Sequence, residues 1–170
     1  MIERNLLNHN LYTFSSAYML PTPLAELLND VDGQTTVLVT GVFDVLHQEH
    51  IHFLTNAKEA GDVLIVAIES DTRVRQIKGS GRPHFSQQQR RAHLLELELA
   101  DSVVILPESF SDPEEHTAVI SQIRPTYLAV SSHTKHLDKK EHILAKDGGT
   151  VLVVHTFNPT ESTSLLLDKN

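Results

Sequence analysis

The chain is organised around residues 40–50, which read TGVFDVLHQEH. Directly before this stretch, residues 36–40 form a short run rich in β-branched side chains, a pattern typical of a buried strand. Directly after it, apolar side chains recur at helical spacing up to Gly61, where a glycine can end a helix. The pattern therefore predicts a strand, a tight turn containing Gly41, and a helix over about residues 48–60.

His47 and His50 fall at the start of this predicted helix. Residues three apart on a helix are neighbours, so both imidazoles can project from one side of the first turn. A helix N-terminus carries free N–H groups and a partial positive charge, which favour an anion. The stretch thus predicts a phosphate-binding corner at the carboxyl end of a parallel strand. The alternative is a pair of first-turn histidines that share this spacing by chance.

Composition narrows the class of protein. The 170 residues, 40% of them hydrophobic, suit one folded domain. A formal net charge of −8 argues against a general nucleic-acid binder. The absence of cysteine excludes disulfides, thiolate catalysis and cysteine-ligated zinc. The longest apolar run, residues 63–68, is too short to cross a bilayer, and no secretory signal is seen, so we expect a cytoplasmic protein without a membrane partner.

Strand and helix patterns alternate along most of the chain. Strands are expected near residues 36–40, 63–69, 102–106, 126–130 and 150–155, and helices near 48–60, 71–77, 86–99, 113–123 and 137–146. This alternation predicts an α/β domain over residues 35–170, with a parallel sheet covered by helices on both faces. Residues 1–34 are interpreted as an N-terminal extension whose short helix packs on the domain or on a partner subunit.

Residues 41–50 follow the pattern G-x-F-D-x-x-H-x-x-H, which resembles the signature of the cytidylyltransferase-like nucleotidylyltransferases. The resemblance is strongest to glycerol-phosphate cytidylyltransferases and to the adenylyltransferase domain of bifunctional heptose-phosphate enzymes, and it covers about residues 35–166. It implies a Rossmann-like fold with strand order 3-2-1-4-5 and a homodimer. It also implies transfer of a CMP or AMP group from a nucleoside triphosphate to a small phosphorylated sugar or polyol, with release of pyrophosphate.

Such a reaction needs aligned reactants and neutralised phosphate charge, usually with Mg²⁺, and no nucleophilic side chain. His47 and His50 are expected to donate to the phosphates. Val42 and Phe43 are expected to contribute backbone N–H groups, the Phe43 ring being core, while Asp44 braces the turn. No resident metal site is assigned.

Lys78 follows the second predicted strand and its short helix. The resembled enzymes have a comparable lysine-glycine pair here, with the lysine near the phosphates, so Lys78 joins the two histidines as a catalytic candidate. The alternative is an ordinary exposed lysine in a loop.

Two further segments match the resembled enzymes. The resemblance implies that Arg90, in a glutamine-arginine pair, reaches the nucleotide; Arg91 competes for this assignment, and a solvated helix arginine is the alternative. Ser162, Thr163 and Ser164 resemble the second signature of the family, a serine-threonine run that opens the last helix and binds the triphosphate. Taken alone, that run would be only a helix N-cap.

The match fails at two places. The family has glycine where this chain has Glu49, whose charge would repel a triphosphate unless it turns outward, binds a cation or serves a changed ligand. The heptose enzymes carry Lys-Gly-Gly-Asp at residues 130–133, where this chain has Val130 in place of the lysine and His133 in place of the aspartate. The identity of the acceptor substrate is therefore left open. No role is assigned to His155.

Three hypotheses of different kinds remain. The first is the nucleotidyltransferase, and the second is a non-catalytic nucleotide or phosphate sensor that has kept the fold. The third is a metal hydrolase using His47, Glu49 and His50. It is the weakest, because H-x-E-H does not match the helical H-E-x-x-H spacing and no third ligand is evident.

Overall fold

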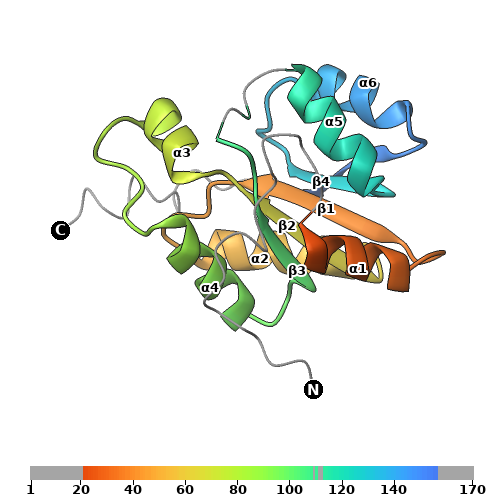
Figure 1. The fold of residues 1–170 in the computed structure, drawn as a ribbon, viewed down its shortest axis with the longest axis horizontal. Helices are drawn as coiled ribbons and strands as arrows, with labels where there is room; N and C mark the ends of the chain where they lie inside the picture. Colours follow the sequence, from red (N-terminus) through yellow and green to blue (C-terminus); the bar gives the residue numbers. More distant parts are fainter. Residues whose placement is uncertain (1–20, 109, 111–112, 157–170) are drawn as a thin grey trace.

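The structure is a computed structural model that describes residues 21–108, 110 and 113–156 (Figure 1). The strands are β1 (Thr36–Gly41), β2 (Val63–Ile68), β3 (Ser102–Ile105), β4 (Tyr127–Ser131) and β5 (Thr150–His155). The helices are α1 (Thr22–Asp30), α2 (Gln48–Glu59), α3 (Asp71–Lys78), α4 (Gln87–Glu96), α5 (Pro113–Ile123) and α6 (Leu137–Ala145). No helix within these described ranges combines the length and the apolar character needed to cross a membrane.

Every expected strand and helix is present, and most bounds differ from expectation by one residue at most. The exception is α4, which ends at Glu96 instead of running to about residue 99. The physical reason is Glu98, whose φ of 55° lies in the left-handed region and cannot continue a right-handed helix. The chain turns there and enters β3.

The five strands form one parallel sheet with the order β3-β2-β1-β4-β5, which confirms the predicted order. β1 is the strand at which the direction of winding reverses, because β2 and β4 lie on either side of it. In open sheets of this kind ligands bind in the crevice outside the carboxyl ends of the strands at such a reversal. The end of β1 therefore positions the site.

Two hydrophobic clusters cover the two faces of the sheet. Because strand side chains alternate, Leu38 enters one cluster while Val37 and Val39 enter the other. α5 and α6 lie on one side of the sheet, and α2 and α4 on the other (Figure 1). Each fully buried Leu or Ile side chain contributes about 1.5–3 kcal/mol, and Ile65 at 0% exposure is one of these. The predicted covering of both faces is confirmed.

The short helix expected before the sheet is α1, and it packs on the domain itself. Leu24 is fully buried in the cluster that α5 and α6 also cover, and Leu27, Leu28 and Val31 pack against that cluster. The apolar stripe on this helix therefore adds to the core of the sheet, which is one of the two placements that the sequence left open.

Candidate functional site

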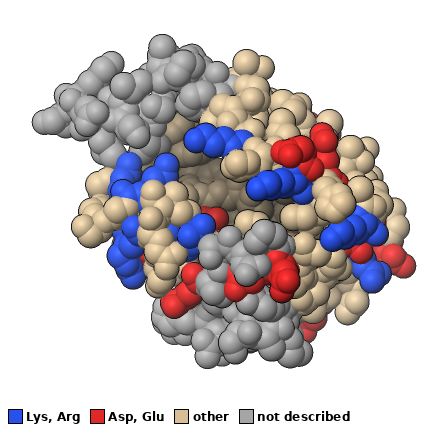
Figure 2. Space-filling view, turned by 90° about the horizontal axis from the view of Figure 1, so that it is seen from above, with Lys and Arg blue, Asp and Glu red and all other residues tan. Residues whose placement is uncertain are grey.

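A cavity of about 460 Å³ opens at the carboxyl ends of the central strands. Its walls come from the turn after β1, the first turns of α2, the end of α3 and the loop that follows it, the end of β4 with its following loop, α6, and the last residue of β5. Lys and Arg side chains border the hollow in the space-filling view (Figure 2). The cavity lies at the reversal of strand order, where the topology places a ligand.

The turn that opens the cavity depends on Gly41 and Phe43. A Cβ atom on Gly41 would lie 2.6 Å from Cε2 of Phe43, so the ring closes over a position that only glycine leaves open. Phe43 itself has a φ of 48°, and its ring is 5% exposed in the core. The ring packs 5.3 Å, centroid to centroid, from that of His50. The tight turn therefore sets the position of the histidine pair.

His47 and His50 stack on each other, with ring centroids 3.9 Å apart and ring planes at 29°. His47 is the N-cap residue of α2, and His50 lies in its first turn. Burial lowers the pKa of His50 to about 4; nearby His47 lowers it too, while the Val45 backbone and Glu49 raise it. At neutral pH the His50 ring is therefore neutral, with one N–H donor and one acceptor nitrogen. Both rings line the cavity.

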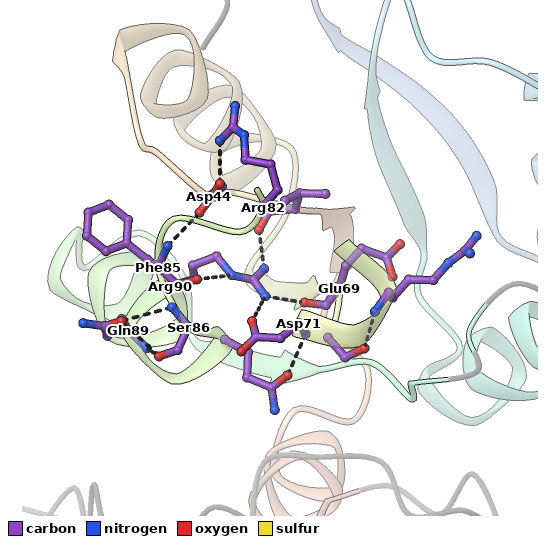
Figure 3. Close-up of polar contacts among 12 residues, drawn as sticks. Asp44, Glu69, Asp71, Arg82, Phe85, Ser86, Gln89 and Arg90 are labelled. Atoms are coloured by element: carbon purple, nitrogen blue, oxygen red, sulfur yellow. Dashed lines mark hydrogen bonds and ion pairs between the residues drawn. The ribbon is translucent and has the colours of Figure 1, made fainter. Parts of the chain in front are cut away.

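Asp44 links the turn to the loop after α3. Its carboxylate accepts hydrogen bonds from the backbone N–H groups of His84 and Phe85, and it pairs with the guanidinium of Arg82 (Figure 3). Burial alone would raise the pKa of Asp44, but the N–H groups of Phe85 and His84 and the side chain of Arg82 outweigh it and lower the pKa. Asp44 thus braces the neighbouring loop and brings Arg82 to the cavity wall, beside exposed Lys78 at the end of α3.

Arg90 has a different place from the one expected. Its side chain is fully buried and does not line the cavity. The guanidinium donates to the carbonyl oxygens of Phe85, Val42 and Glu69 and to the carboxylate of Asp71 (Figure 3). Instead of reaching the cavity to contact a nucleotide, Arg90 holds the backbone of the turn after β1 in place through hydrogen bonds.

The reason lies in the start of α4. Ser86 and Gln89 form a reciprocal capping box that fixes the helix N-terminus. Arg90 then points toward the backbone that follows β1 and β2. Arg91, the competing candidate, also turns inward, since its Nε donates to the carbonyl oxygen of Val103 and its exposure is 7%.

Glu49 turns inward to a partner that the sequence did not indicate. Its Oε2 lies 2.9 Å from Nε2 of His155, the last residue of β5, and the two side chains are only 11% and 12% exposed. Both residues line the cavity. Glu49 therefore does not turn outward, the first of the three expectations for it. In this topology the N-terminus of α2 lies next to the carboxyl end of β5, and only this adjacency could have indicated His155 as the partner.

Another part of the cavity wall comes from β4, the loop after it and α6. Ser131 and His133 bond to each other at 2.7 Å, and Lys140 of α6 reaches the same cavity. Burial lowers the pKa of Lys140, and the nearby carboxylate of Glu69 raises it. Burial raises the pKa of Glu69 to about 7, against the lowering effect of Arg73, Arg90 and Lys140. A third cation thus stands beside the cavity, where sequence reasoning had assigned none.

The structure therefore brings most of the sequence candidates together. Val42, Phe43, His47, His50 and Lys78 line one cavity, and Arg90 lies behind it.

Ser162, Thr163 and Ser164 lie outside the described residues. Within residues 21–108, 110 and 113–156, no group of three or more acidic or histidine side chains is arranged to hold a metal ion. The cavity carboxylates Asp44 and Glu49 each bond to partners within the protein.

The family described as cytidylyltransferase-like matches residues 38–162 of this chain. Two curated relatives carry the name bifunctional protein HldE. The one from Cronobacter sakazakii is 36% identical over 137 residues, which are 79% of this chain and 27% of that protein. The one from Photobacterium profundum is 38% identical over 139 residues, which are 80% of this chain and 28% of that protein. The chain thus spans less than a third of the length of these relatives.

Solved structures agree in fold. The lipopolysaccharide core biosynthesis protein from Thermoplasma volcanium superposes with a TM-score of 0.61 at 28% identity, over 74% of this chain and 98% of that one. The pantoate-beta-alanine ligase from Francisella tularensis, crystallised with an ATP compound and beta-alanine, gives a TM-score of 0.64 over 86% of this chain and 70% of that one. At 15% identity the second likeness shows the fold alone.

Proposed function

Because the chain belongs to the cytidylyltransferase-like family, we propose that it transfers a nucleotidyl group from a nucleoside triphosphate to a small phosphorylated sugar or polyol. The observation that carries the proposal is the stacked pair of His47 and His50 at the start of α2, in one cavity with Lys78 and Arg82. This arrangement supplies N–H donors, a helix N-terminus and two cations to a polyphosphate.

In the proposed reaction an oxygen of the acceptor phosphate attacks the α-phosphorus, and the bond to the pyrophosphate oxygen breaks. Negative charge grows on the leaving pyrophosphate and on the oxygens of the α-phosphate. Neutral His50 donates one hydrogen bond to those oxygens, and Lys78 neutralises charge on the leaving group. Asp44 and Arg90 act through the turn: they hold loop and backbone in place and touch no reacting atom.

Mg²⁺ is proposed to enter with the triphosphate, as part of the substrate. It is a hard cation that binds through phosphate oxygens and keeps several waters. Among the described cavity residues the carboxylates belong to Asp44 and Glu49, which bond to Arg82, His84, Phe85 and His155. The described part of the cavity therefore offers the ion no ready pair of carboxylates, and the phosphates are proposed to supply anionic ligands.

The test is pyrophosphate release by the purified chain with Mg²⁺, with ATP and CTP as alternative donors, against a panel of sugar and polyol phosphates. We expect release with one donor and one acceptor class, and His50→Asn should remove most of it. His52→Asn is the matched control, because His52 lies on the same helix, is exposed and does not line the cavity. Equal loss in both variants, or none in either, would contradict the role of the pair.

A phosphate or nucleotide sensor is the second candidate. The observation that favours it is Glu49, a carboxylate one residue from His50 in the cavity wall. Nucleotide binding in a calorimeter without pyrophosphate release across the whole panel would select the sensor.

Light scattering on the same samples would test the homodimer that the resemblance implies.

A further inference from the structure

Glu49 and His155 form a pair that is built into the cavity wall. The pair joins the first turn of α2 to the last residue of β5, and a second bond holds the same elements together, because Nδ2 of Asn56 donates to the carbonyl oxygen of Val154 at 2.8 Å. The ring of Phe53 stands edge-on to that of His155, with centroids 6.2 Å apart. The carboxylate and the imidazole are therefore held in fixed positions facing one cavity.

The cavity has cationic groups as well as this acidic one. Lys78 and Arg82 come from the end of α3 and its loop, and Lys140 comes from α6. A phosphate gains from those cations and is repelled by the carboxylate of Glu49. The polyanionic part of a ligand is therefore favoured near the lysines and the arginine, and a different chemical group must face Glu49.

Neutral hydroxyl groups fit the wall that Glu49 and His155 make. A carboxylate offers about four lone-pair positions, so the bond to His155 does not exhaust its capacity to accept. A hydroxyl donates to a carboxylate in a short, charge-assisted bond, and an imidazole nitrogen can take part in a bond to a second, adjacent hydroxyl. A cationic amine is a poorer fit, since three cations already line the cavity.

We propose that Glu49 and His155 bind adjacent hydroxyl groups of the ligand's carbohydrate part, either the ribose of the nucleotide or the polyol of the acceptor. The proposal rests on the proposed function and deepens it, since it divides the cavity into a phosphate side and a hydroxyl side. It also gives Glu49 a use at a position where, in the resembled family, the side chain is absent.

The experiment compares probes with and without hydroxyls by calorimetry on the full chain with Mg²⁺. A ribonucleoside triphosphate is compared with its 2′,3′-dideoxy form, and glycerol 3-phosphate with n-propyl phosphate. Inorganic tripolyphosphate serves as the hydroxyl-free polyanion. We expect the wild type to prefer the hydroxylated member of one pair by about 10-fold or more, and the pair that shows it identifies ribose or polyol as the source.

Variants then assign the preference to the two residues. Glu49→Gln and His155→Gln should each remove most of the preference for the hydroxylated probe. Glu49→Gln should also raise the affinity for tripolyphosphate several-fold, because the repelling charge is gone. Glu59→Gln, an exposed change on the same helix, should alter neither quantity.

If the wild type binds tripolyphosphate and releases pyrophosphate but shows no preference within either pair, the proposal is overturned while the proposed function stands. If no probe binds, both fail. A hydroxyl preference that persists in folded Glu49→Gln and His155→Gln would also overturn the proposal, because other residues would then bind the hydroxyls. If one of these variants does not fold, the other still assigns the preference.

Discussion

Nη1 of Arg90 lies 2.6 Å from the carbonyl oxygen of Val42, a residue 48 positions earlier in the chain. The same guanidinium bonds to Glu69, Phe85 and Asp71, so one buried side chain ties the turn after β1 to the end of β2, the loop before α4 and the start of α3. The stability of the fold and the shape of the site therefore depend on the same residue.

Replacing Arg90 should damage both. Arg90→Lys keeps the charge but cannot reproduce the planar set of donors, so buried acceptors lose their partners. We expect a loss of about 3 kcal/mol in the free energy of unfolding, measured by urea denaturation, and a lower kcat for pyrophosphate release. Arg75→Lys, on the exposed face of α3, is the control and should change neither. Full stability of Arg90→Lys would show that these bonds are not needed.

Arg90 also shows where sequence reasoning stops. The glutamine-arginine pair was visible in the sequence, but the direction of the Arg90 side chain was not, because that depends on the rotation of α4 about its axis against β3. The strand-turn-helix unit around Gly41 was predictable, since strand, turn and helix signals there are local and agree.

The contact between Glu49 and His155 could not be read from the sequence for a related reason. The two residues are 106 positions apart, and only the sheet order brings β5 next to the start of α2. A residue that breaks a family pattern indicates that something nearby has changed with it, and it does not say what. The partner became visible only when the strands were placed.

Asp44→Asn should weaken the link between the turn and the loop that carries Arg82. The amide keeps one acceptor oxygen but loses the charge that Arg82 and the two N–H groups stabilise. Since the folded-state pKa of Asp44 lies below its unfolded value of 3.8, its stabilising effect is present above pH 4 and is lost as pH falls through the folded pKa. Asp44→Asn should therefore cost about 1–2 kcal/mol at pH 7 and cost less near pH 3. An equal loss at both values, measured by urea denaturation, would contradict this account.

His50 should make phosphate binding depend on pH. Its pKa is about 4 in the folded chain and 6.5 ordinarily, so a bound polyanion that raises this pKa causes proton uptake in mildly acid solution. We expect tripolyphosphate to bind several-fold more tightly at pH 5.5 than at pH 7.5, with proton uptake seen by calorimetry in buffers of different ionisation enthalpy. The groups around the ring are His47, Phe43 and Glu49, of which Glu49 carries the opposing charge.

The same shift has a consequence for stability without ligand. A base whose folded pKa is lowered contributes stability above its unfolded pKa, and that contribution is lost as pH falls from 6.5 towards 4. The loss is at most about 3 kcal/mol for a shift of this size. His50→Asn should flatten both the binding profile and the stability profile in this window, whereas His52→Asn should leave them unchanged. Persistence of the binding slope in His50→Asn would assign it to another group.

Glu69 should oppose stability at high pH. Burial raises its pKa from 4.5 to about 7, so the folded chain holds a proton there that the unfolded chain has lost, and stability falls as pH rises between these values. Glu69→Gln removes this effect. The free energy of unfolding of the variant, relative to that of the wild type, should therefore be higher at pH 8 than at pH 5, by at most about 3 kcal/mol. The lost attraction to Lys140 and Arg73 reduces the gain. Glu96→Gln, an exposed change at the end of α4, should show no such difference. Urea denaturation at the two pH values measures it, and a gain for Glu69→Gln at pH 5 as large as that at pH 8 would mean that a cause other than the ionisation of Glu69 is responsible.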